Sequence, residues 1–126
     1  MISFNYLSKL LMFPAYYIIH YNIFFGWFHK KFIKRFKYKN FIFELKNCDL
    51  PLPSYSSFIF NTYELNDRIL LEKNLSKKNK CIIIGGGIGF VPSITNKITG
   101  NKIIVFEINK KIIPNLKKNL NNNCSN

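Results

Sequence analysis

Residues 81–90 have the sequence CIIIGGGIGF, and this stretch decides which fold the chain is expected to adopt. Its first four residues form a short apolar run, which is typical of a strand buried on both faces of a parallel sheet. The glycines that follow predict a tight turn in which the backbone can approach a ligand closely. A helix of about ten residues is expected to start near Phe90, with Pro92 in its first turn and Gly100 at its end.

A second strand and a second helix are predicted after this stretch. Lys102 to Phe106 form a β-branched run that Glu107 closes, Lys110 to Leu120 show helical apolar spacing, and Asn121 to Asn126 are expected to fray. Strand, glycine loop, helix, strand and acidic residue in this order are typical of the first half of a nucleotide-binding βαβ unit. Glu107 follows Gly85 by 22 residues. At that separation a carboxylate at the tip of the second strand can accept hydrogen bonds from ribose hydroxyls.

The loop favours an adenosyl ligand without phosphate. A dinucleotide fingerprint has a third glycine where this chain has Phe90, and a bulky side chain there is expected to hinder close packing of the helix on the strand. A Walker phosphate loop is excluded, since no Gly-Lys-Ser/Thr follows. S-adenosylmethionine is a ligand of the remaining kind. An oxidoreductase fragment that binds NAD or FAD stays open as an alternative.

Residues 63–123 resemble the start of an FkbM-type methyltransferase domain, which uses S-adenosylmethionine. The similar pieces are Tyr63-Glu64, the loop from Gly85 to Phe90, Val105-Phe106-Glu107 with Asn109, and a helix end with Leu116, Asn119 and Asn123. The chain departs from the family pattern at three positions. The family commonly has Asp at the position of Ile83, Asn at that of Gly87 and Pro at that of Ile108. Loss of the Asp removes a polar anchor near the amino-acid end of the cofactor.

The resemblance implies an α/β fold in which residues 81–126 are the first βαβα portion of a Rossmann-like methyltransferase sheet. It implies that Gly85, Gly87 and Gly89 line the cofactor pocket and that Glu107 holds the ribose. The candidate cofactor-binding residues are Gly85, Gly86, Gly87, Ile88, Gly89, Glu107 and Ile108. The implied cofactor is S-adenosyl-L-methionine, and the implied reaction transfers its methyl group to a hydroxyl of a sugar or glycolipid. No catalytic base is identified. Because the family domain continues with further strands, the chain is expected to be a fragment that is inactive by itself.

Residues 1–40 are expected to form an aromatic and basic helical leader without Asp or Glu. The uncharged run from Leu10 to Phe28 allows three interpretations: a membrane span, a helix on an anionic membrane surface, or a helical layer packed on the domain. Apolar residues at helical spacing form a stripe beside a cluster of cations. The stripe consists of Trp27, Phe28, Phe32, Ile33 and Phe36, and the cluster of Lys30, Lys31, Lys34, Arg35, Lys37 and Lys39. Residues 30–39 are thus a candidate contact with anionic lipid.

Residues 41–80 are expected to precede the cofactor-binding portion with one strand and one helix. Phe41 to Leu45 are predicted to form the strand, and Glu64 to Leu75 the helix. Pro51 interrupts the chain between them, and Ser54 to Thr62 show no clear period.

Composition limits the classes of protein that remain. A chain of 126 residues holds one domain at most, and its 48% apolar residues exclude a highly charged disordered chain. The net charge of +13 suits a membrane surface or a nucleic acid, so a basic module that associates with a membrane surface without catalysis stays open as a further alternative function. The nucleic acid ranks lower because no base-reading motif is present. Three widely spaced cysteines and two histidines predict neither a disulfide framework nor a metal site, which favours a cytoplasmic protein, with the inner membrane face as an alternative.

Overall fold

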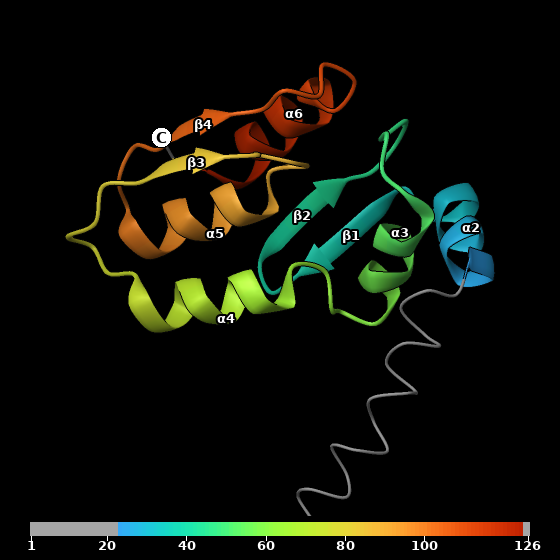
Figure 1. Ribbon diagram of the computed structural model, residues 1–126, viewed down its shortest axis with the longest axis horizontal. Helices are drawn as coiled ribbons and strands as arrows, with labels where there is room; N and C mark the ends of the chain where they lie inside the picture. The colour runs from blue at the N-terminus through green and yellow to red at the C-terminus, as the bar shows by residue number, and fades with distance from the viewer. Residues whose placement is uncertain (1–22, 125–126) are drawn as a thin grey trace, which may run out of the picture.

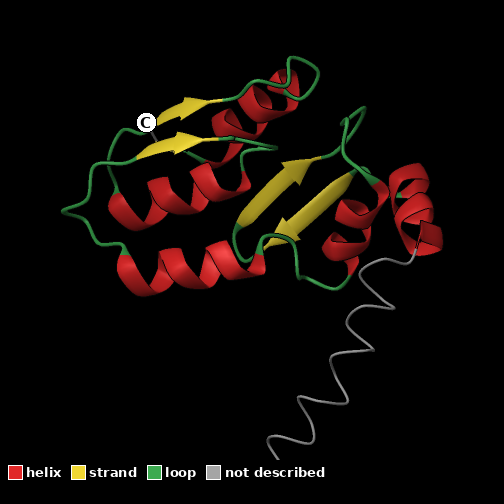
Figure 2. Cartoon of the chain, in the orientation of Figure 1, coloured by secondary structure: helices red, strands yellow, loops and turns green. Residues whose placement is uncertain are grey.

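The computed structural model describes residues 23–124, so every expectation for residues 1–22 lies outside the described residues. The described part is a mixed α/β structure, as predicted (Figures 1 and 2). Its elements are α2 (Ile23–Phe32), β1 (Arg35–Tyr38), β2 (Phe41–Glu44), α3 (Leu52–Ile59), α4 (Leu65–Asn74), β3 (Ile82–Ile84), α5 (Phe90–Thr99), β4 (Ile104–Phe106) and α6 (Ile113–Asn123). Among residues 23–124, no helix has the length and apolar character needed to cross a membrane.

The strands form two separate pairs. β1 and β2 are antiparallel, with Phe36 opposite Phe43, whereas β3 and β4 are parallel, with Ile83 opposite Val105. The predicted order of strand, glycine loop, helix and strand is therefore present in β3, α5 and β4, and α5 ends at the left-handed Gly100 as expected. One parallel pair establishes no wider strand order, so the Rossmann-like sheet stays a prediction.

The expectation that the first parallel strand is buried on both faces is wrong for the described chain. Ile82 and Ile84 of β3 are exposed, as are Ile104 and Phe106 of β4. The alternate residues of both strands are half-buried, because successive side chains of a strand point to opposite faces. Helix α5 lies along one side of this pair (Figure 1), and within residues 23–124 no second layer covers the other face.

Phe90 joins the two strand pairs and does not hinder packing at β3, which corrects the prediction made for it. Its ring is fully buried, with ring centroids 5.2 Å from Phe43, 5.4 Å from Tyr38 and 5.5 Å from Tyr63. The side chain leaves the start of α5 toward the aromatic core on β1 and β2. An aromatic residue at this position therefore contributes to the core that holds α5 against the antiparallel pair.

The close approach that a glycine permits occurs at Gly86. A Cβ atom there would lie 2.6 Å from Cγ1 of Val105 and 3.0 Å from Cδ2 of Leu116. We expect Gly86→Ala to destabilise the protein by about 1–3 kcal/mol, because a β-branched strand residue moves aside poorly. Urea denaturation measures this loss. Val105→Ala in the Gly86→Ala background should recover part of it, and strictly additive losses would contradict the proposed overlap.

The helical leader expected through residue 40 ends earlier than predicted. Arg35–Tyr38 form β1, because Phe36 and Tyr38 point into the core while Arg35 and Lys37 are exposed, which is the alternation of a strand. In contrast, β2 and α4 confirm the strand and the helix predicted for residues 41–80 to within one residue at each end. The segment without a clear period contains α3, which begins after Pro51.

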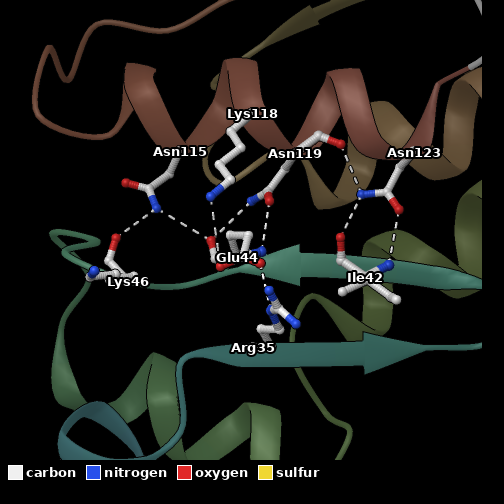
Figure 3. A network of polar contacts seen from close by, with 8 residues as sticks. All are labelled: Arg35, Ile42, Glu44, Lys46, Asn115, Lys118, Asn119 and Asn123. Carbon is white, nitrogen blue, oxygen red and sulfur yellow. Dashed lines mark hydrogen bonds and ion pairs between the residues drawn. The ribbon is translucent and has the colours of Figure 1, made fainter.

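Helix α6 begins three residues later than predicted and continues through Asn123, so the fraying expected from Asn121 is wrong for residues 121–123. Asn115, Asn119 and Asn123 lie at every fourth position and contact the backbone of β2 (Figure 3). We call these three residues the asparagine ladder. A step of four residues along a helix rises about 6 Å, close to the two-residue repeat of about 6.7 Å along a strand, so amide side chains can meet alternate peptide groups.

The asparagine ladder forms hydrogen bonds with the edge of β2, as the backbone of a neighbouring strand would. The amide of Asn123 accepts from the N–H of Ile42 and donates to its carbonyl, both at 2.9 Å. Asn119 accepts from the N–H of Glu44 at 2.7 Å and donates to the Glu44 carbonyl at 3.2 Å and the Ile88 carbonyl at 2.8 Å. Asn115 donates to the carbonyls of Glu44 and Lys46. The ladder thus ties β2 to α6 and to the glycine loop.

Candidate functional site

The glycine loop, residues 85–89, folds across the carboxyl end of β4. The N–H groups of Gly85 and Gly86 donate to the carbonyl of Phe106 at 2.9 and 3.0 Å. The N–H of Gly89 donates to the carbonyl of Gly86 at 2.9 Å, which closes the turn before α5. Gly87 has a φ of +54°, a left-handed conformation that a residue with a side chain adopts at a cost. The loop therefore lies at the carboxyl edge of the parallel pair, where α/β proteins bind ligands.

Glu107 lies directly against this loop. Its Oε2 accepts the N–H of Gly87 at 2.7 Å, and its Oε1 accepts the N–H of Asn109 at 2.7 Å. These backbone hydrogen bonds lower the pKa of the carboxyl, the contribution of Asn109 being the larger. A carboxylate has about four acceptor positions, so these bonds leave acceptor capacity for a hydroxyl of a ligand. The sequence-based expectation that Glu107 and the glycine loop are neighbours agrees with this geometry.

The other candidate residues differ in what they can offer to a ligand. The side chain of Ile88 is fully buried in the aromatic core, so only its backbone is available. The side chain of Ile108 is almost entirely exposed next to Glu107. The N–H of Gly86 donates to the carbonyl of Phe106, whereas a Cβ added at Gly87 would meet only the side chains of Tyr63 and Glu64, each at ordinary contact distance.

Glu64 is a carboxylate at the site to which the sequence analysis gave no role. A Cβ built on Gly87 would lie 3.9 Å from Oε1 of Glu64 and 3.8 Å from the hydroxyl of Tyr63. Glu64 precedes α4 with a φ of +47°, and its carboxylate is hydrogen-bonded by the Tyr63 side chain and by the N–H of Val91. Its neighbours come from α4, α5 and the loop. No sequence pattern could show this, because the burial of Glu64 arises only when these elements pack together.

Burial of Glu64 makes stability depend on pH. Desolvation raises the pKa of this carboxyl to about 7, above its value of 4.5 in the unfolded chain. The folded state therefore binds more protons between these values, and the contribution of Glu64 to stability falls as pH rises from 4.5 to about 7. We expect Glu64→Gln to exceed the parent in stability at pH 8 and to match it near pH 4.

Urea midpoints of parent and variant across this range measure the effect. The difference in urea midpoint between parent and variant reports on Glu64 alone. Desolvation also lowers the pKa of the buried His29, but His29 contributes equally to both proteins. Parallel curves for parent and variant would show that Glu64 stays solvated.

An open cleft of about 520 Å³ adjoins the glycine loop. It lies between α4 and the end of β3 and extends to the start of α5. Its lining residues are Glu64, Asp67, Leu70, Leu71, Asn74, Leu75, Ile83, Ile84, Gly85 and Val91. The lining holds two carboxyl groups and no Lys or Arg, although the chain carries 19 cations and only six acidic residues. The cleft is thus a place where this basic protein presents acidic and apolar groups.

Fold and site together define a class: a mixed α/β protein with a glycine loop after a parallel strand and a carboxylate from the next strand bound to that loop. Comparison with known proteins narrows this class no further, since no family model, no curated protein and no solved structure matches the chain. Function is therefore inferred from the residues and their geometry.

Proposed function

We propose that residues 63–109 bind S-adenosylmethionine and form the cofactor-binding part of a methyltransferase. The observation that carries the proposal is the position of Glu107, held charged by Gly87 and Asn109 at the carboxyl edge of β4. A carboxylate fixed there, with acceptor positions left over, fits the two hydroxyls of a ribose. The sequence resemblance to FkbM-type methyltransferases, with a Rossmann-like sheet, supports the same ligand.

The charge of the cleft favours this cofactor over a dinucleotide. S-adenosylmethionine carries a sulfonium and an ammonium group, and the cleft beside the loop presents Glu64 and Asp67 without a cation. A diphosphate would meet the charged carboxylate of Glu107 directly at Gly87, and like charges at such short range repel. The NAD or FAD alternative is therefore the weaker one.

The proposed reaction transfers a methyl group to a hydroxyl of a sugar or glycolipid acceptor. Such a transfer requires the acceptor oxygen, the methyl carbon and the sulfur to be aligned, and a base where the hydroxyl needs one. The residues of the glycine loop and Glu107 would hold and orient the cofactor, which supplies the methyl group. In this proposal the described residues would provide the cofactor side of the arrangement.

Isothermal titration with S-adenosylhomocysteine tests the proposal. We expect a saturable heat with one site per chain, and a rise in melting temperature because a ligand of the folded state stabilises it. NAD and FAD serve as comparison ligands and should leave the melting temperature unchanged. No heat from S-adenosylhomocysteine with folded protein, or stabilisation by a dinucleotide instead, would reject the proposed cofactor.

A further inference from the structure

We propose that α2 docks the protein on an anionic membrane surface through its aromatic outer side. This inference concerns a different surface from the cofactor site and does not depend on it. Helix α2 lies at one end of the molecule, on the far side of α3 from the parallel strands (Figure 1).

One side of α2 packs against α3. Gly26 faces α3 so closely that a Cβ would lie 2.2 Å from the carbonyl oxygen of Leu52. His29, one turn further on, is buried, with its ring 5.8 Å from Tyr55 and 5.7 Å from Phe58. These two positions fix the rotation of the helix about its axis, so the residues on the opposite side face away from the protein.

The opposite side is aromatic and exposed. We call Phe24, Trp27, Phe28 and Phe32 the α2 aromatic face. Their exposed fractions are 64%, 47%, 43% and 58%. Within this face, the rings of Phe28 and Phe32 contact each other at a centroid distance of 4.8 Å. An exposed apolar patch of this kind, rimmed by polar residues, marks a site of interaction with a protein or a membrane.

Lysines lie next to the α2 aromatic face, and their charge indicates which kind of partner binds there. Lys31 lies over Trp27, with its Nζ 4.9 Å from the ring centroid, and the exposed Lys30 has its Nζ 5.6 Å from the ring centroid of Tyr55 on α3. In the described part of the chain, Lys30, Lys31 and Lys37 take part in no ion pair, whereas Arg35 pairs with Glu44. No acidic residue precedes Glu44 in the sequence. The surface thus offers apolar rings and uncompensated positive charge side by side.

An anionic lipid surface fits both properties. Aromatic rings, tryptophan above all, partition into the interface between headgroups and acyl chains, and nearby lysines gain from the negative surface potential. A nucleic acid would use the cations but would leave most of this apolar area in water. We therefore assign lipid, and not nucleic acid, as the partner of the α2 aromatic face.

Trp27 provides a direct test in the unaltered full chain, because it is the one tryptophan in the sequence. We expect vesicles of phosphatidylserine and phosphatidylcholine to shift its emission to shorter wavelength and to sediment the protein. Vesicles of phosphatidylcholine alone should do so far less, and added salt should weaken the effect. Sedimentation with unchanged Trp27 emission would overturn the proposal, because another surface would then contact the lipid.

Paired variants identify the contributing residues. Lys30→Gln with Lys31→Gln should weaken vesicle binding about 30-fold, since each cation near the surface contributes about a fivefold effect. Phe28→Gln with Phe32→Gln should weaken it at least as much. Matched controls should bind as the parent does: Lys77→Gln with Lys78→Gln for the charge, and Ile82→Thr with Ile104→Thr for exposed apolar area.

The controls also show which results would contradict the proposed lipid contact. Equal losses in the Ile82 and Ile104 control would place the contact on the exposed face of β3 and β4. Binding to single-stranded RNA without binding to vesicles would overturn lipid as the partner. Circular dichroism of each variant shows whether the fold is retained, and the Trp27 emission of the parent decides the matter even if a variant fails to fold.

Discussion

We expect Glu107→Gln to lower the affinity for S-adenosylhomocysteine about 10- to 100-fold, as measured by isothermal titration at pH 7.5. The substitution removes the negative charge that strengthens hydrogen bonds from ribose hydroxyls, and bonds to a charged group contribute about 1.5–3 kcal/mol. Glutamine keeps an oxygen that can still accept the N–H of Gly87 or Asn109. Because its NH2 group cannot accept the other N–H, we also expect a lower melting temperature, and the affinity is compared at a temperature where the variant is folded.

Glu72→Gln is the matched control for this prediction. It neutralises another carboxylate, which pairs with Lys39 at 2.6 Å on the exposed surface and does not line the cleft. Its affinity for the ligand should equal that of the parent, and its melting temperature should change little because exposed ion pairs contribute little. If Glu107→Gln and the parent bind with equal affinity, Glu107 does not hold the ribose.

Asn119→Leu destabilises the protein by about 3 kcal/mol, because it leaves buried backbone groups without partners at a cost of about 1–3 kcal/mol each. The N–H of Glu44 and the carbonyl of Ile88 lose bonds of 2.7 and 2.8 Å. Leucine is apolar and has the same branching and number of side-chain heavy atoms as asparagine, so most of the expected loss comes from the missing hydrogen bonds. The free energy of unfolding from urea denaturation measures the effect.

Two substitutions on the same helix calibrate this value. Asn123→Leu should cost less, at most about 1 kcal/mol, because water can replace its bonds to the exposed Ile42. Asn121→Leu changes an exposed residue outside the asparagine ladder and should stay within about 0.5 kcal/mol of the parent. Three equal losses would mean that the ladder contributes only through helix propensity.

Local signals account for the parts of the fold that could be predicted. The apolar run before Gly85 and the positions of Pro92 and Gly100 predicted β3 and both ends of α5, because chain reversal and helix termination depend on residues within a few positions. The spacing between Gly85 and Glu107 predicted that they would be neighbours, since the carboxyl ends of adjacent parallel strands share one edge.

The failed predictions share one cause, namely contacts between segments distant in the sequence. Residues 35–38 have apolar positions that fit both periods, and β1 forms because β2 and Phe90 accept Phe36 and Tyr38. Asn123 belongs to the asparagine-rich end that was expected to fray, yet its side chain forms hydrogen bonds with the backbone of Ile42 at the edge of β2.

By itself, the sequence determined the strand, glycine loop and helix of residues 82–99 and the charged, aromatic character of the α2 region, because these follow from local conformational preference and composition. Only the tertiary structure decided that Phe90 belongs to the core, that Glu64 is half-buried beside Gly87 and that an aromatic face of α2 remains exposed. Burial and exposure depend on which surfaces the packed elements leave to water, and one-dimensional spacing does not contain that information.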